Sequence, residues 1–193
     1  MIISLLSNLV APLIPSKPPP EHVSDSTIQD WLSKVPDTDD AKLDYVYDEV
    51  KSKVEYDLEC ADSIDTKAGV TLALVGTLLT IISAVIATGP KPIFAAFCSA
   101  AIVLLLLAGG YSGLTFTARD WGKAPKPAAL VELAASESIS AIKKTVIAKW
   151  IEEFATNKGT VNFKSGCFNR ALLFALCGVS LLGVGIIVSF FVA

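Results

Sequence analysis

Three long apolar runs dominate the hydrophobic pattern of the chain. They cover residues 68–88, 92–114 and 171–193, and none contains Asp, Glu, Lys, Arg or His. Because a helix rises about 1.5 Å per residue, each run can cross the roughly 30 Å hydrocarbon core of a bilayer. Three such runs in 193 residues predict three transmembrane helices rather than buried helices of a soluble protein.

The basic residues predict how these spans are oriented. Gly89, Pro90 and Lys91 join the first two spans, which must therefore form an antiparallel hairpin. Other basic residues gather near the opposite ends of the spans: Lys51, Lys53, Lys67, Arg119, Lys123, Lys126, Lys158, Lys164 and Arg170. By the positive-inside rule, the N-terminus and residues 115–170 are cytoplasmic and the C-terminus is outside.

Residues 39–67 have the pattern of an amphipathic helix. Apolar residues recur at three- and four-residue spacing: Leu43, Val46, Tyr47, Val50, Val54, Leu58 and Ala61. Asp39 or Asp40 can cap the start of this helix. No Gly or Pro interrupts it before Lys67, so we expect a cytoplasmic stalk helix that continues into the first span.

A second amphipathic helix is expected within the cytoplasmic segment 115–170. Pro125 and Pro127 end the crossing, a helical pattern runs from Ala128 to Thr156, and Gly159 is expected to end it. This helix is the natural partner of the stalk helix, in a cytoplasmic helical hairpin. The opposite charges of the two segments favour this pairing, within one chain or between protomers.

The first 38 residues form a separate segment. Residues 1–14 are apolar but too short to span a bilayer, and they can be a weak membrane-surface anchor or a frayed terminus. The following proline-rich stretch is interpreted as a linker, with a short turn at Ile28 to Leu32.

Composition agrees with an all-α membrane protein. Hydrophobic residues make up 52% of the chain and charged residues 18%, below the roughly 25% usual in soluble domains. Residues 1–66 hold 14 of the 19 acidic residues, and the basic residues farther along lack the pattern of a nucleic-acid-binding surface. His22 is the single histidine and the four cysteines form no CxxC pair, so we expect neither a metal site nor an enzyme.

Two polar segments flank the predicted spans on the cytoplasmic side. One contains Asp62, Asp65 and Lys67, before the first span, and the other runs from Asn157 to Arg170, before the third. Two interpretations are open: the segments meet in a charge-paired collar, or they simply anchor the helices at the interface.

Small residues recur in the spans and would allow helices to approach closely. They are Gly69, Ala73, Gly76, Gly109, Gly113, Gly178, Gly183 and Gly185. They are consistent with a homo-oligomer, although packing of the three spans within one chain can use the same positions.

The order and spacing of these features resemble the Pycsar transmembrane effector family, which belongs with the SLATT-type bacterial effector domains. The matching residues are Asp65, Lys67, Ala68, Gly69, Asn157, Asn162 and Lys164. The resemblance covers about residues 40–193 and leaves the N-terminal 38 residues outside.

The resemblance implies an antiphage effector that acts beside a nucleotide cyclase. Infection would raise a cyclic pyrimidine monophosphate, cCMP or cUMP, and the effector would respond by damaging the bacterial inner membrane, causing abortive infection. The sequence contains no P-loop and no GxGxxG, so any nucleotide site must be built from helices, across protomers. Charge and location suggest these ligand-binding candidates: Lys51, Lys53, Asp65, Lys67, Lys123, Asn157, Asn162 and Lys164.

A different class of function is also compatible with the pattern. The chain could be a non-enzymatic membrane scaffold whose acidic stalk binds a partner protein. A membrane enzyme is the weakest hypothesis, since no nucleophile, base or catalytic constellation is visible in the sequence.

Overall fold

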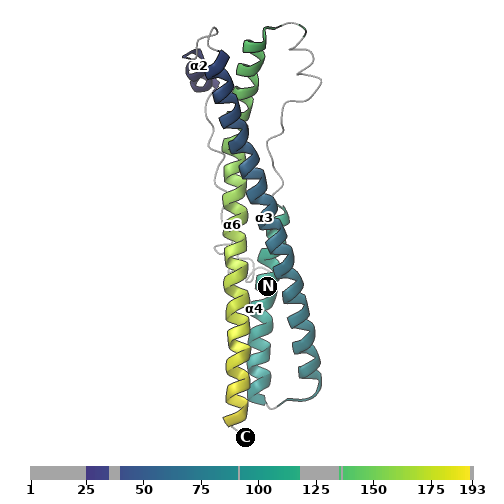
Figure 1. Cartoon of the computed structure of the whole chain (residues 1–193). Helices are drawn as coiled ribbons and strands as arrows, with labels where there is room; N and C mark the ends of the chain where they lie inside the picture. The colour runs from purple at the N-terminus through teal and green to yellow at the C-terminus, as the bar shows by residue number, and fades with distance from the viewer. Residues whose placement is uncertain (1–24, 35–39, 91, 118–134, 136, 192–193) are drawn as a thin grey trace, which may run out of the picture. The chain divides into compact units, whose positions relative to one another are not determined.

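The computed structural model describes residues 25–34, 40–90, 92–117, 135 and 137–191. Helices are the only regular elements in this part of the chain: α2 (Asp25–Ser33), α3 (Asp40–Ala87), α4 (Pro92–Thr117) and α6 (Ile139–Phe191) (Figure 1). The predicted all-α class is therefore confirmed. Expectations for residues 1–14, Lys91, Lys123, Pro125 and Pro127 fall outside the described residues.

Three of these helices, α3, α4 and α6, are long and apolar enough to cross a membrane. As predicted, α3 begins at Asp40 and continues without interruption from the stalk into the first apolar run. The hairpin after it closes at Gly89, whose φ of 72° lies in the left-handed region that glycine adopts easily. The Gly89 amide donates to the carbonyl oxygen of Ile86 at 3.1 Å, which satisfies part of the helix terminus.

The predictions for residues 28–32 and for Gly159 are wrong. The interpretation of Ile28 to Leu32 as a short turn in a linker fails, because these residues belong to the nine-residue helix α2. Gly159 does not end a helix, because α6 continues through it to Phe191. An interior glycine costs a helix only about 1 kcal/mol relative to alanine, and its neighbours Asn157 and Thr160 are fully buried. Packing of those neighbours therefore outweighs the propensity of the glycine.

The described residues fall into two compact units, and each is considered separately. The membrane unit comprises residues 63–90, 92–117 and 163–191. Its core contains Val75 and Ile82 of α3, Leu105 of α4 and Ala175 of α6, so all three helices contribute. Large apolar side chains such as Leu74, Leu106 and Leu176 are exposed on the outside of this unit, as expected of surfaces that face lipid.

Glycines bring α6 and α4 close together in the membrane unit. A Cβ atom added at Gly185 would lie 2.7 Å from Phe97 Cβ, and one at Gly178 would lie 3.2 Å from Leu105. By contrast, an added Cβ at Gly76, Gly113 or Gly183 would meet nothing within 4 Å. Packing within the chain thus uses only part of the set of small residues found in the sequence.

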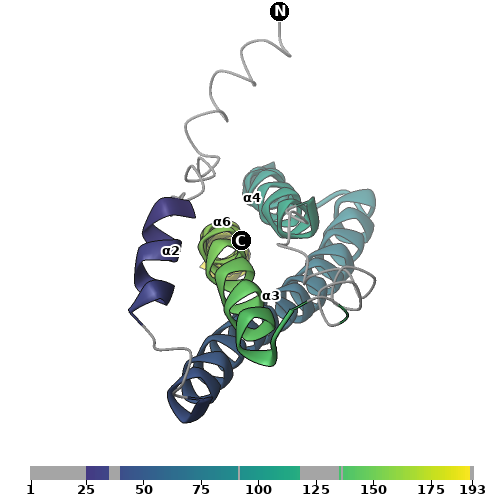
Figure 2. The same cartoon turned by 90° about the horizontal axis from the view of Figure 1, so that it is seen from above.

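The stalk unit comprises residues 25–34, 40–62, 135 and 137–162. Ile28 of α2, Leu43 of α3 and Ile147 of α6 form its buried cluster, and Figure 2 shows these three helices next to one another. Tyr47 and Trp150 are in ring contact, with centroids 4.9 Å apart. The expected packing of the stalk on the following helix is therefore confirmed within one chain.

The two helices of the stalk unit are parallel, which corrects the expected hairpin. Asp44 pairs with Lys143, and Tyr47 contacts Trp150, so contacts advance in the same direction along α3 and α6. The reason is that α6 is one continuous helix from Ile139 to Phe191 and carries its own span, as α3 does.

Candidate functional site

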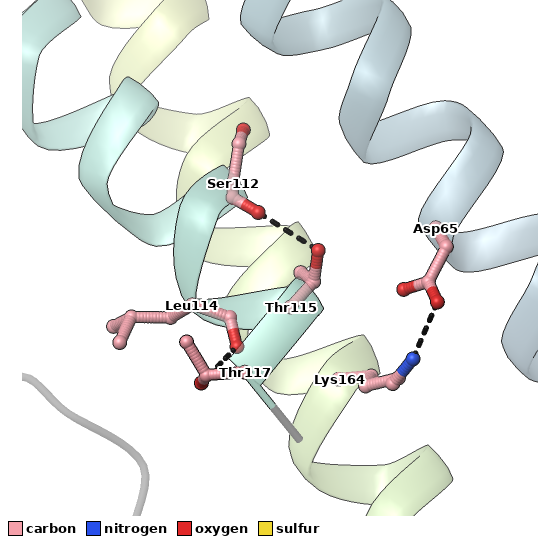
Figure 3. A network of polar contacts seen from close by, with 6 residues as sticks. All are labelled: Asp65, Ser112, Leu114, Thr115, Thr117 and Lys164. Carbon is pink, nitrogen blue, oxygen red and sulfur yellow. Dashed lines mark hydrogen bonds and ion pairs between the residues drawn. The ribbon is translucent and has the colours of Figure 1, made fainter. Parts of the chain in front are cut away.

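An ion pair between Asp65 of α3 and Lys164 of α6 is the main polar contact of the membrane unit. Lys164 Nζ lies 2.5 Å from Asp65 Oδ2 (Figure 3). The lysine side chain is 1% exposed and the aspartate side chain 30% exposed. An ammonium group buried to this degree requires a compensating charge, because removing it from water is costly. Of the two open interpretations, this pair agrees with the charge-paired collar at these two residues.

Helical periodicity explains why Lys164 faces inward. Cys167, Ala171 and Ala175 follow it along α6 at three- and four-residue spacing, and all three are buried. Lys164 therefore occupies a position of the inward-facing stripe where an apolar residue would normally lie. A charge at such a position costs stability, so it indicates a role other than simple packing.

Helix α4 adds hydroxyl groups to the same unit. Ser112 and Thr115 are fully buried, and Thr115 Oγ1 donates to the carbonyl oxygen of Ser112 at 2.8 Å (Figure 3). Tyr111, one residue earlier, stacks on Phe174 of α6 with ring centroids 5.5 Å apart. The last turns of α4 are therefore polar on their buried side, unlike the apolar stretch around Leu105.

Several buried polar atoms of the membrane unit lack a hydrogen-bond partner among the described residues. They are Asp65 Oδ1, the Tyr111 hydroxyl oxygen and Ser112 Oγ. A buried polar atom without a partner costs roughly 1–3 kcal/mol. Helix packing around these atoms therefore contributes less to the stability of the unit than packing in its apolar core does.

The stalk unit has its own buried polar residues. Glu153, Asn157 and Thr160 of α6 are buried at three- and four-residue spacing. Burial raises the pKa of Glu153, and the Lys149 ammonium opposes this rise. Burial likewise raises the pKa of Asp57, which the positive charge of Lys158 partly offsets. Both carboxyl groups therefore lose their proton at a higher pH than exposed carboxyl groups do.

The other ligand-binding candidates differ in exposure and contacts. Lys51 and Lys53 are exposed and pair with Glu55 and Glu49 of their own helix, at 3.9 and 3.6 Å. Lys67 and Asn162 are exposed, whereas Asn157 is fully buried. Among the candidates, the structure brings Asp65 and Lys164 together.

The sequence interpretation missed several buried polar residues. They are Tyr111, Ser112, Thr115, Glu153 and Thr160, and one carboxylate oxygen of the half-buried Asp57 is covered as well. Thr160 precedes Lys164 by four residues, and Glu153 precedes Asn157 by four, so helical spacing from the recognised polar residues would have found these two. No comparable signal marked Ser112 and Thr115. They follow a continuously apolar run, and such a run does not indicate which face of the helix is buried.

An all-helical bundle with three membrane-spanning helices defines a multi-pass membrane protein. The family model of the Pycsar effector protein domain matches residues 57–192, more than two thirds of the chain. The chain therefore belongs to the Pycsar effector family, and it is an antiphage defence effector. No curated protein and no solved structure shows significant similarity to it.

Proposed function

We propose that this effector responds to a cyclic nucleotide, cCMP or cUMP, and impairs the integrity of the bacterial inner membrane, so that infection is aborted. The family match over residues 57–192 carries this proposal, because the matched region contains all three spans. An effector composed of spans and helices would act on the bilayer directly, without catalysis.

The nucleotide would be recognised by charge and hydrogen bonding. The candidates are Lys51, Lys53, Asp65, Lys67, Lys123, Asn157, Asn162 and Lys164. Lysine ammonium groups suit a cyclic phosphate, while asparagine amides and a carboxylate suit the edge of a pyrimidine. Lys51, Lys53 and Lys67 are the exposed cations among the described residues of this set, and sites shared between protomers of a homo-oligomer would bring more of them together.

Membrane polarisation in cells tests this proposal. Cells that express the protein are given cCMP, cUMP or, as a control, cAMP, and a voltage-sensitive dye reports the membrane potential. We expect depolarisation with a cyclic pyrimidine nucleotide and none without it. Normal polarisation with every nucleotide, although the protein is present in the membrane fraction, would contradict the proposal.

That negative outcome would favour a scaffold function. Tyr45 and Tyr56 are 71% and 64% exposed on the acidic stalk helix, and they would offer a partner protein an aromatic contact surface. A scaffold would bind its partner without changing the membrane potential.

A further inference from the structure

We propose that the ion pair between Asp65 and Lys164 is a latch that keeps the three spans in a closed arrangement, and that separating the two charges opens the bundle. The inference rests on the proposed membrane-impairing activity and adds how that activity is held off at rest. The latch joins α3 to α6 within the membrane unit, where Lys164 is 1% exposed.

The energetics of buried ion pairs favour such a role. A buried pair adds little net stability, since removing two charges from water offsets most of their attraction. Breaking the pair is nevertheless unfavourable, because the buried Lys164 ammonium then loses the opposite charge of Asp65. The closed bundle is thus more stable while Asp65 contacts Lys164 than after that contact is lost.

Polar atoms near the pair also favour opening. Asp65 Oδ1 and Ser112 Oγ are buried without hydrogen-bond partners among the described residues, and Figure 3 draws both residues close to the ion pair. Both atoms would gain hydrogen bonds to water if the helices separated here. The apolar core around Val75 and Leu105 offers no such gain.

Burial also separates the latch from direct ligand contact. A phosphate cannot reach Lys164 in the closed bundle, because its side chain is covered. Lys67, two residues after Asp65, is exposed and can meet an anion. A nucleotide would therefore act on the latch by drawing the Asp65 segment of α3 away, and Lys164 would not be its first contact.

The native Cys167 reports the state of the bundle without any assumption about nucleotide. It lies three residues from Lys164 and is fully buried, so it should react slowly with N-ethylmaleimide in the closed state. Full-length protein in membranes is labelled without nucleotide, and the rate at Cys167 is read by peptide mass spectrometry. Membrane potential is recorded in the same cells.

We expect Asp65→Asn to label Cys167 at least about tenfold faster than the native protein and to depolarise cells without nucleotide. Lys164→Met should have a smaller effect, because the carboxylate left behind is 30% exposed and can be hydrated. Exchanging the charges in Asp65→Lys/Lys164→Asp should restore protection. The matched control is Asp30→Asn, which breaks an exposed pair with Lys34 and should change nothing.

Unchanged labelling in Asp65→Asn, or a charge exchange that labels as fast as the single variant, would overturn the latch. If the single variants do not accumulate in the membrane, the double variant Asp65→Leu/Lys164→Met tests the latch instead. An apolar pair should protect Cys167 at least as well as the native protein, and faster labelling would overturn the proposal. Fast labelling without depolarisation would support the latch and contradict the membrane-impairing activity, so the two failures are distinguishable.

Discussion

At the residue scale, the structure places charged side chains where an amphipathic pattern expects apolar ones. Lys164 and Glu153 both lie on buried positions of α6, with exposed fractions of 1% and 5%. Lys164 is compensated by Asp65. For Glu153, burial outweighs the nearby positive charge and raises its pKa. The free-energy cost of a buried charge therefore depends on its partner as well as on its burial.

The substitution Glu153→Gln should stabilise the protein at neutral pH. The pKa of Glu153 is raised in the folded state, so the folded chain binds more protons than the unfolded one, and stability falls as pH rises through the unfolded value of about 4.3. Glutamine removes this loss, and we expect a gain on the order of 1 kcal/mol near pH 7 that vanishes below about pH 4.

Thermal unfolding in detergent across this pH range measures the effect. Glu152→Gln is the matched control, because Glu152 is 39% exposed and its pair with Lys149 contributes little. A gain in Glu152→Gln as large as that in Glu153→Gln would show that burial is not the cause.

At the element scale, both units contain an apolar cluster, and glycines add a close approach of helices in the membrane unit. In the membrane unit, α6 approaches α4 at Gly178 and Gly185. In the stalk unit, α2, α3 and α6 meet at Ile28, Leu43 and Ile147. Glycine matters only in the first case, because lipid supplies no hydrophobic driving force and close packing must hold the helices together.

The substitution Gly185→Ala should destabilise the membrane unit by about 1–3 kcal/mol. Its new Cβ atom would lie 2.7 Å from Phe97 Cβ, so α4 and α6 must move apart. Gly183→Ala is the control on the same helix, since nothing lies within 4 Å of its added Cβ. The control should be neutral or slightly stabilising.

Thermal unfolding in detergent compares the two glycine variants. Equal stability of both would mean that close approach of α6 to α4 does not contribute to the fold.

At the scale of the whole molecule, the fold is that of a multi-pass membrane effector of the Pycsar family. Its helices are long, with 48 residues in α3 and 53 in α6, and each contains both an apolar span and a polar amphipathic portion. Each of these two helices therefore continues without interruption from its amphipathic portion into its span.

The distribution of basic residues predicts that the C-terminus lies outside the inner membrane. An alkaline phosphatase fused after Ala193 should be active, and a green fluorescent protein at the same place should be dark. Fusions after Gly89, in the hairpin between α3 and α4, should behave in the same way. The reverse pattern would contradict the proposed orientation and place the basic segments outside.

The sequence by itself determined the three spans and the stalk helix, because their signals are local. Apolar runs without charge, three- and four-residue spacing, and the aspartate at the start of α3 act over a few turns and need no distant partner. The pairing of Asp65 with Lys164 was not determined in this way, because the two residues are 99 positions apart and the sequence left simple anchoring at the interface equally open.

Only the tertiary structure decided which faces are buried and in which direction the helices pair. It revealed that the stalk portions of α3 and α6 are parallel, that Gly159 lies inside a helix, and that Ser112, Thr115 and Glu153 are buried. These features depend on contacts between residues far apart in the chain, which outweigh local propensity. In a uniformly apolar span, no sequence pattern distinguishes a face that meets protein from a face that meets lipid.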